Sequence, residues 1–182
     1  ERGTKTAKTW NFRAKPRSLK RLRLAGFDAL NLANNHVYDY GRQGFLDTLR
    51  HVKKAKFTII GAGKDRAEAE AVHVFSVNGL RLGVLGFTST HPRQAWAKAS
   101  RPGVAYSDFD RLALVIGAAK KKCDALVVSL HGGTELAELP NQIQRGFGRL
   151  AIDAGADIVI GHHPHKLQPV EVYKGKPILH SI

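Results

Sequence analysis

The chain has 182 residues, of which 43% are hydrophobic and 24% charged, so it is long enough to bury the core of one globular domain. No apolar run reaches the roughly 18 residues that a membrane-spanning helix needs, and no signal peptide is recognisable. A single cysteine, Cys123, excludes an internal disulfide.

The charge is strongly positive. The chain has 29 Lys and Arg against 15 Asp and Glu, for a formal net charge of +14. The excess lies mainly in residues 1–23 and recurs in residues 51–56 and 118–123. Such a field attracts nucleic acid, anionic lipid, an acidic polymer or a phosphorylated substrate, although it can also serve solubility alone. No helix-turn-helix, zinc finger or basic motif interleaved with aromatic residues accompanies it, so we do not expect nucleic acid as the partner.

The first half of the sequence alternates helical and extended patterns. Pro16 and Gly26 bracket the first helix, and Phe45, Leu49 and Val52 share one face of the second. The Asn78-Gly79 pair predicts a tight turn between two apolar runs. The expected elements are a helix over 16–26, a strand over 27–35, a helix over 44–56, a strand over 57–63, a hairpin over 71–90 and a loop over 88–107.

The second half continues the alternation. The expected elements are a helix over 108–122, a strand over 124–130, a helix over 141–155, a strand over 157–161 and a hairpin over 168–182 that turns at Lys174-Gly175. Strands that alternate with helices predict an α/β fold, with a layered mixed sheet, flanking helices and one domain over residues 1–182. Ligand sites in such sheets form where the strands end.

Nitrogen and amide-oxygen donors follow three of these strands. They are Asn34, Asn35 and His36 after the first strand, His131 after strand 124–130, and His162, His163 and His165 after strand 157–161. Imidazole and amide oxygen are ligands for divalent metals, so we expect the three strand ends to converge on a metal site. We expect a bend at Gly161 to aim both His163 and His165 at one centre.

Each signal also has a plainer interpretation when it is taken alone. His131 could be an ordinary polar residue at a strand end, and Asn34-Asn35 could be a turn or a helix cap. The combination of three such strand ends favours the metal site.

Several segments together resemble a known family. "LANNHVYDYGRQGFLDTL", "VVSLHGGTEL" and "IDAGADIVIGHHPH" are similar to the bacterial capsule-synthesis CapA/PgsA family, and the resemblance extends from about Trp10 to the end of the chain. That family is linked to poly-γ-glutamate capsule production, and its fold is like that of the calcineurin-type metallophosphoesterases. The resemblance therefore implies divalent metal ions, either Mn, Fe or Zn, and a phosphoesterase-type site.

The resemblance also assigns residue roles. It implies that Asn35 binds a metal and that His36 is a catalytic residue near the leaving group. His131 matches an isolated metal ligand. The paired metal-binding histidines match His163 and His165, with His162 as a further candidate because it follows Gly161 directly. These last candidates are all in the "GHHPH" segment.

Two acidic residues also lie at family positions. For Asp39, which we place with His36 in the catalytic group, we expect a role either in orienting His36 or in capping the following helix, and we favour the cap. Glu135 could support the metal ligands or be a plain surface carboxylate.

The sequence departs from the family pattern at both ends. The superfamily's first strands supply an Asp and a second acidic ligand, and nothing before Trp10 matches either of them. The closing segment of the family is cut after Ser181. With no methionine in the chain, we expect a fragment truncated at both ends, holding one metal or none stably and inactive without the upstream segment.

Two functions remain open at this point. The first is an extracytoplasmic cell-envelope protein, anchored by an upstream segment and associated with a membrane capsule-synthesis complex, whose metal site hydrolyses or transfers a phosphoester or handles an anionic polymer. In that case His36 acts as general acid or electrostatic clamp, and Lys166, Arg42 and Arg93 could hold the substrate. The second is a non-catalytic component that binds a polyanion during export and keeps a vestigial metal site.

Overall fold

The computed structural model describes residues 3–90 and 92–182. A six-stranded mixed sheet forms the centre of its C-terminal half, a name used here for residues 73–88 and 108–182. In spatial order its strands are β4 (His73–Val77), β5 (Leu80–Thr88), β7 (Ala125–His131), β8 (Ile158–His162), β10 (Lys176–Leu179) and β9 (Val170–Tyr173). The four inner strands are parallel, whereas β4 and β9 run antiparallel at the two edges. The expected layered α/β architecture is therefore confirmed.

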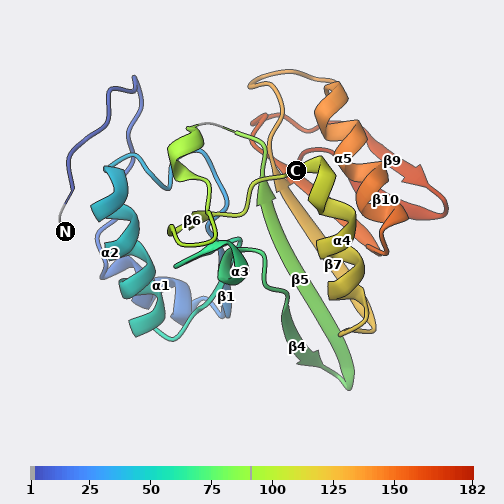
Figure 1. The fold of residues 1–182 in the computed structure, drawn as a ribbon, viewed down its shortest axis with the longest axis horizontal. Helices are drawn as coiled ribbons and strands as arrows, with labels where there is room; N and C mark the ends of the chain where they lie inside the picture. Colours follow the sequence, from blue (N-terminus) through green and yellow to red (C-terminus); the bar gives the residue numbers. More distant parts are fainter. Residues whose placement is uncertain (1–2, 91) are drawn as a thin grey trace.

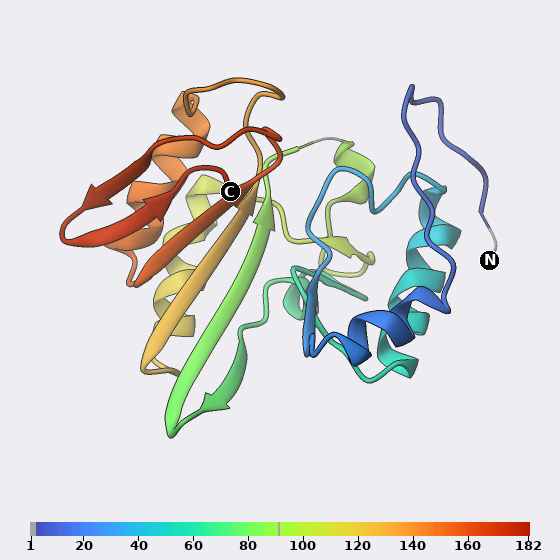
Figure 2. The same cartoon turned by 180° about the vertical axis from the view of Figure 1, so that it is seen from behind.

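Two helices, α4 (Phe109–Lys120) and α5 (Gln142–Asp153), cover the same face of this sheet, as Figures 1 and 2 show from opposite sides. Each begins where the sequence offers a side-chain cap. Asp108 accepts a hydrogen bond from the backbone of Asp110, and Asn141 forms a capping box with Gln144. Beneath the helices, Phe87 and Phe147 pack edge to face at a centroid distance of 6.0 Å in the first hydrophobic core.

The N-terminal half is built around a much smaller sheet. Its elements are α1 (Ser18–Leu24), β1 (Ala29–Asn31), α2 (Gly41–Lys54) and β2 (Thr58–Ile60). β1 and β2 form a parallel pair that is separate from the main sheet, and a second hydrophobic core surrounds Phe45 and Leu49. The prediction that residues 27–35 form one of the strands of the main sheet is wrong, because only Ala29–Asn31 is extended and the chain then turns.

The region between the two halves is more regular than its sequence indicated. Residues 88–107, expected to be a loop, contain a 3₁₀ turn, η1 (Arg93–Ala95), and the short strand β6 (Gly103–Val104). β6 pairs antiparallel with β3 (Ala62–Gly63), and α3 (Arg66–Ala69) follows β3. These elements are too short to leave a periodic pattern.

The predicted turns are confirmed. Asn78 and Gly79 have φ values of 51° and 83°, and Lys174 and Gly175 have values of 49° and 76°. Two successive positive φ angles define the hairpin turn whose twist matches that of paired strands.

Close contacts hold the two halves together at the carboxyl end of β1. The Asn31 side chain donates a hydrogen bond to Ser129 Oγ at 3.1 Å, which ties β1 to β7. Gly61 has φ +71°, and a Cβ at this position would lie only 2.9 Å from the carbonyl oxygen of Gly86. The carboxyl ends of β1 and β2 are therefore packed against β7 and β5 of the main sheet.

Candidate metal centre

The loop after β1 places Asn35 and His36 at the boundary between the halves. Asn34 does not reach the centre, because its Oδ1 accepts a hydrogen bond from the backbone N–H of His36 at 2.9 Å and so shapes the turn. Asn35 Oδ1 lies 2.9 Å from His131 Nε2 at the end of β7. Two of the three predicted strand ends therefore meet, although they belong to different sheets.

His131 is held in its neutral form. Burial, followed by the nearby His163 and His162, lowers its pKa from 6.5 to about 3. A neutral imidazole keeps a lone pair on one ring nitrogen, which is the form that binds a metal. The rings of His131 and His163 have centroids 4.9 Å apart, and this contact brings the end of β8 to the end of β7.

The backbone leaves the extended conformation at His163 and His165, whose ligand atoms lie close together. Their φ angles are 101° and 56°, in a region that side-chain-bearing residues rarely occupy. The bend was expected at Gly161, but that residue is part of β8, and a Cβ there would collide with the carbonyl of His180. The turn is therefore made by the histidines themselves.

Glu135 completes a group of three possible ligands. One donor atom from each of Glu135, His163 and His165 lies within 4.8 Å of the others. Glu135 and His165 are exposed, and His163 is half-buried. A side-chain carboxylate and two imidazoles are common ligands of zinc, iron and manganese, so these three residues could hold such an ion.

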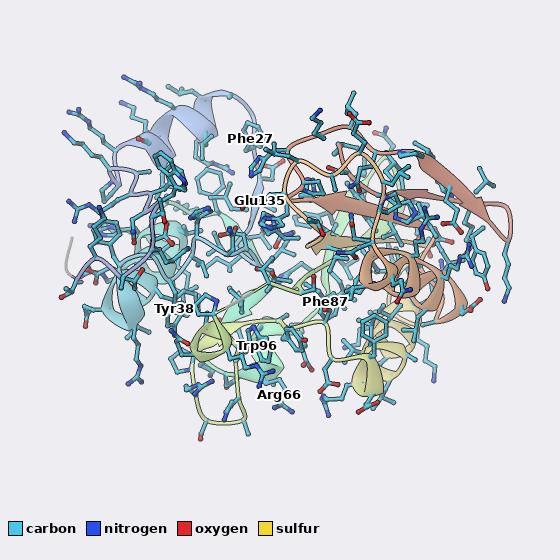
Figure 3. The ribbon with its side chains drawn as sticks, turned by 90° about the horizontal axis from the view of Figure 1, so that it is seen from above. Phe27, Tyr38, Arg66, Phe87, Trp96 and Glu135 are labelled. Carbon is cyan, nitrogen blue, oxygen red and sulfur yellow. The ribbon has the colours of Figure 1, made fainter. Side chains whose placement is uncertain are left out.

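Two glutamines hold the loop that carries Glu135 in place. Gln168 donates to the carbonyl of Ala137 at 2.9 Å, and Gln144 donates to Gln168 Oε1 at 2.8 Å. The backbone N–H of Leu136 also donates to the carbonyl of Pro164 at 2.8 Å. Figure 3, which looks down onto this end of the molecule, shows Glu135 between the N-terminal and C-terminal halves.

His162 has a different position from the other two histidines of its cluster. It lies opposite His131 in the β7–β8 register, and burial lowers its pKa. It does not belong to the group of three ligands found in the described residues. Its predicted role as a metal ligand stays a prediction.

Asp39 holds His36 in place. Its carboxylate is 1% exposed and accepts hydrogen bonds from His36 Nδ1 at 2.7 Å, Lys8 Nζ at 2.6 Å and the backbone N–H of Phe12 at 2.8 Å. Burial opposes ionisation, but these bonds outweigh it, so the pKa of Asp39 is below 3.8. The predicted helix cap is wrong, because Tyr40 is the N-cap residue of α2 and no side chain caps this helix. Asp39 instead orients His36.

The donor set fits a divalent cation. It combines an amide oxygen, at least three imidazoles and a carboxylate around one boundary. His163 Nδ1 is buried and has no hydrogen-bond partner in the described part of the chain. A buried polar atom without a partner is costly, and a ligand that uses the ring nitrogens would justify this position.

The three predicted substrate-holding cations make other contacts. Lys166 Nζ lies 3.4 Å from Glu138, and the Arg93 guanidinium lies 5.7 Å from the centroid of the Trp96 ring. Burial raises the pKa of Tyr38, and the positive charge of Arg42 partly opposes this rise. Lys8 was not predicted. It donates to the carbonyl of Asn35 at 2.9 Å as well as to Asp39, and so contacts both ends of the segment 35–39, which contains His36.

Solved structures identify the fold. The chain superposes on the NAD nucleotidase (NadN) of Haemophilus influenzae with a TM-score of 0.58 and 13% identity, covering 90% of this chain and 31% of that one. It superposes on a 5'-nucleotidase precursor of Thermus thermophilus with a TM-score of 0.60 and 19% identity, covering 92% and 34%. The chain shares the fold of these two nucleotidases, in agreement with the expected fold; at these identities the likeness shows the fold alone.

Sequence comparison identifies the family. Residues 1–182 match the family described as "Bacterial capsule synthesis protein PGA_cap". The PGA biosynthesis protein CapA of Bacillus subtilis is 43% identical over 166 residues, which cover 91% of this chain and 44% of that protein. The capsule biosynthesis protein CapA of Bacillus anthracis is 39% identical over 182 residues, which cover 98% and 44%. The chain belongs to this capsule-synthesis family, and it spans less than half the length of these relatives.

Proposed function

We propose that the centre formed by Asn35, His131, His163, His165 and Glu135 binds divalent metal and acts as a phosphoesterase-type site in capsule synthesis. The observation that carries this proposal is the 2.9 Å contact between Asn35 Oδ1 and His131 Nε2. It joins two separate sheets at a point where a third strand end supplies two more imidazoles. A purely structural contact would not need the buried His163 Nδ1, which has no hydrogen-bond partner in the described residues, and the Glu135 carboxylate at the same place.

The chain's own residues supply the proton chemistry. Bound divalent cations would contribute water activation and charge neutralisation on the phosphoester. As water adds to phosphorus, the bond from phosphorus to the alcohol oxygen breaks, and protonated His36 gives its Nε2 proton to that oxygen. The proton lost by the water restores His36 through solvent. Asp39, bonded to Nδ1, keeps Nε2 directed away from itself throughout.

The cellular setting follows from the relatives. Two of them are named for capsule or PGA biosynthesis, so we propose a role at the cell envelope, an anionic polymer or phosphorylated substrate, and association with a membrane capsule-synthesis complex. The upstream anchor belongs to the same proposal. Within the described residues, no helix combines the length and apolar character needed to cross a bilayer.

Metal analysis combined with an activity assay tests this function. We expect the purified chain to bind Mn²⁺ or Zn²⁺ near stoichiometrically and chelation to lower its melting temperature. Hydrolysis of p-nitrophenyl phosphate is measured with added metal on the chain extended by its upstream segment, without which we expect no activity. His163→Gln should lose most of both properties. His73→Gln on β4, outside the centre, is the matched control. Metal content well below one per chain, with a melting temperature unchanged by chelation, would contradict the proposal.

A second function is favoured by the exposed basic residues of α1. Lys20, Arg21 and Arg23 are exposed on a helix with no acidic residue in its first turn. A chain that only binds a polyanion would retain poly-γ-glutamate at low salt, release it as salt rises, and do so equally with and without metal. Metal-independent binding together with no hydrolysis would select this second function.

A further inference from the structure

A cavity of about 330 Å³ lies directly beside His36. It is enclosed by the segment from Phe12 to Pro16, by α1, by the loop after β1 and by α2. His36 belongs to its lining, so the cavity adjoins the proposed general acid. Its volume is at the lower end of the range for small-molecule sites.

The interior of the cavity is mainly apolar. Leu19, Leu22, Leu32 and Val37 are half-buried around it, and Val52 is buried. Polar residues also line it. Among them, the Asp47 carboxylate is already paired with Arg50 at 3.2 Å, and Thr48 Oγ1 donates to the carbonyl of Gly44. The surface left for a ligand is therefore suited to hydrocarbon.

Phe12 connects the cavity to the reaction centre. Its backbone N–H donates to Asp39, and its ring packs edge-on against the His36 ring at a centroid distance of 4.6 Å. The same residue thus lines the cavity and touches the proposed general acid. A group that fills the cavity would have its nearest polar atom beside His36, where the leaving oxygen must accept a proton.

Basic residues also line the cavity. Arg13, Lys15 and His51 line the cavity together with the apolar residues. An anionic group attached to a hydrocarbon would therefore meet positive charge as its apolar part enters.

We propose that this cavity binds the apolar alcohol portion of a phosphomonoester whose phosphate lies at the histidine centre. The inference rests on the proposed function and adds a substrate class to it: a short alkyl or single-ring aryl phosphate group. A polyglutamate segment does not fit this role, because each of its residues carries a charge that an apolar cavity of this size would desolvate.

Binding of methyl phosphate and n-butyl phosphate to the Zn²⁺-loaded chain tests the inference. Burying a methylene favours binding by about fourfold, so we expect n-butyl phosphate, with three more methylenes, to bind up to about sixtyfold more tightly than methyl phosphate. In NMR spectra of methyl-labelled protein, only the butyl ester should shift the Leu19, Leu22 and Val37 methyl signals. Both esters should shift the imidazole signals of His131 and His163.

Variants make the test specific. Thr48→Phe places an aromatic ring in the cavity and should reduce the butyl-to-methyl affinity ratio to about one to threefold. Leu22→Phe does the same from α1, which guards against failure of one variant to fold. Leu114→Phe, on α4 at a side chain that is 71% exposed, is the matched control and should keep the full ratio.

The outcomes separate the two proposals. Equal affinities, with shifts at the histidines and none at the cavity methyls, would overturn the inference and leave the proposed function standing. Shifts at neither histidine with either ester would overturn the proposed function, and the inference with it.

Discussion

The two halves of the molecule build one site by different physical means. The C-terminal half positions its histidines through a six-stranded sheet, in which the β7–β8 register fixes His131 opposite His162. The N-terminal half has two strands of three residues and positions Asn35 and His36 mainly through side-chain hydrogen bonds from Lys8 and to Asp39. The first means depends on a buried core, and the second depends on a few polar contacts that single substitutions can remove.

The largest effect should come from removing one aromatic ring in each core. Phe147→Ala and Phe45→Ala empty positions that are 0% exposed, and each should lower the free energy of unfolding by about 3–5 kcal/mol. Urea denaturation followed by tryptophan fluorescence and by circular dichroism measures this. If residues 1–182 are one domain, as we propose, each variant keeps a single coincident transition. Two separate transitions in either variant would show that the halves unfold independently.

Removing the central ligand should come next. His131→Ala deletes the imidazole that contacts Asn35 and lies beside His163, and it should weaken Mn²⁺ or Zn²⁺ binding by about 100-fold. Isothermal titration calorimetry measures the affinity. His73→Ala, which removes a half-buried histidine on β4, should bind metal like the unmodified chain. Equal affinity in the His131 and His73 variants would show that the two halves do not share a cation.

A smaller effect should follow from neutralising the carboxylate that orients His36. Asp39→Asn keeps the side-chain shape but removes the charge facing Lys8 and His36, and we expect phosphoester hydrolysis to fall by about 10- to 100-fold with metal content unchanged. Lys8→Met removes the other partner and should reproduce part of the loss. A fall in metal content equal to the fall in rate would instead place Asp39 among the residues that hold the metal.

The smallest effect should be an acid-sensitive contribution from Asp157, at the start of β8. Burial opposes its ionisation, but bonds from Lys120, the Leu126 N–H and Lys176 hold its pKa below 3.8. A lowered pKa stabilises the fold above pH 3.8, and this contribution is lost as pH falls through the folded pKa.

Asp157→Asn should therefore cost about 1 kcal/mol at pH 7, after allowance for solvent screening, and progressively less as the pH falls below 3.8. Thermal denaturation across this pH range checks it. Asp153→Asn, in an exposed pair with Lys174, should change little at either pH. A cost that persists in acid would mean that the side chain acts through packing rather than charge.

Local signals in the sequence predicted most of the C-terminal half. The turn at Lys174-Gly175 and the caps at Asp108 and Asn141 depend on nearby residues, so such features can be predicted from local sequence alone. Gly26 is equally local. It follows α1 with φ +86° and donates to the carbonyl of Arg23, which ends the helix as predicted.

The contacts that build the site depend on distant residues and were only partly predictable. The motifs indicated that Asn35 and His131 would approach each other, but not that their strands belong to separate sheets. Glu135 reaches its position because Gln144 and Gln168 support its loop, and neither glutamine carries a motif for that role. Lys8 contacts Asp39, which is 31 positions away in the sequence, and nothing in the local pattern predicts this contact. The α3 cap could have been found, since Asp65 and Glu68 have the spacing of a helix start.

The left-handed backbone at His163 and His165 has a consequence for how a cation would be received. Each such conformation costs of order 1–3 kcal/mol and persists only where the surroundings enforce it. Relaxation to an extended strand would move both imidazoles away from their present positions beside Glu135. The positions of the two imidazoles are thus set when the chain folds, and the proposed cation would meet ligands that are already in place.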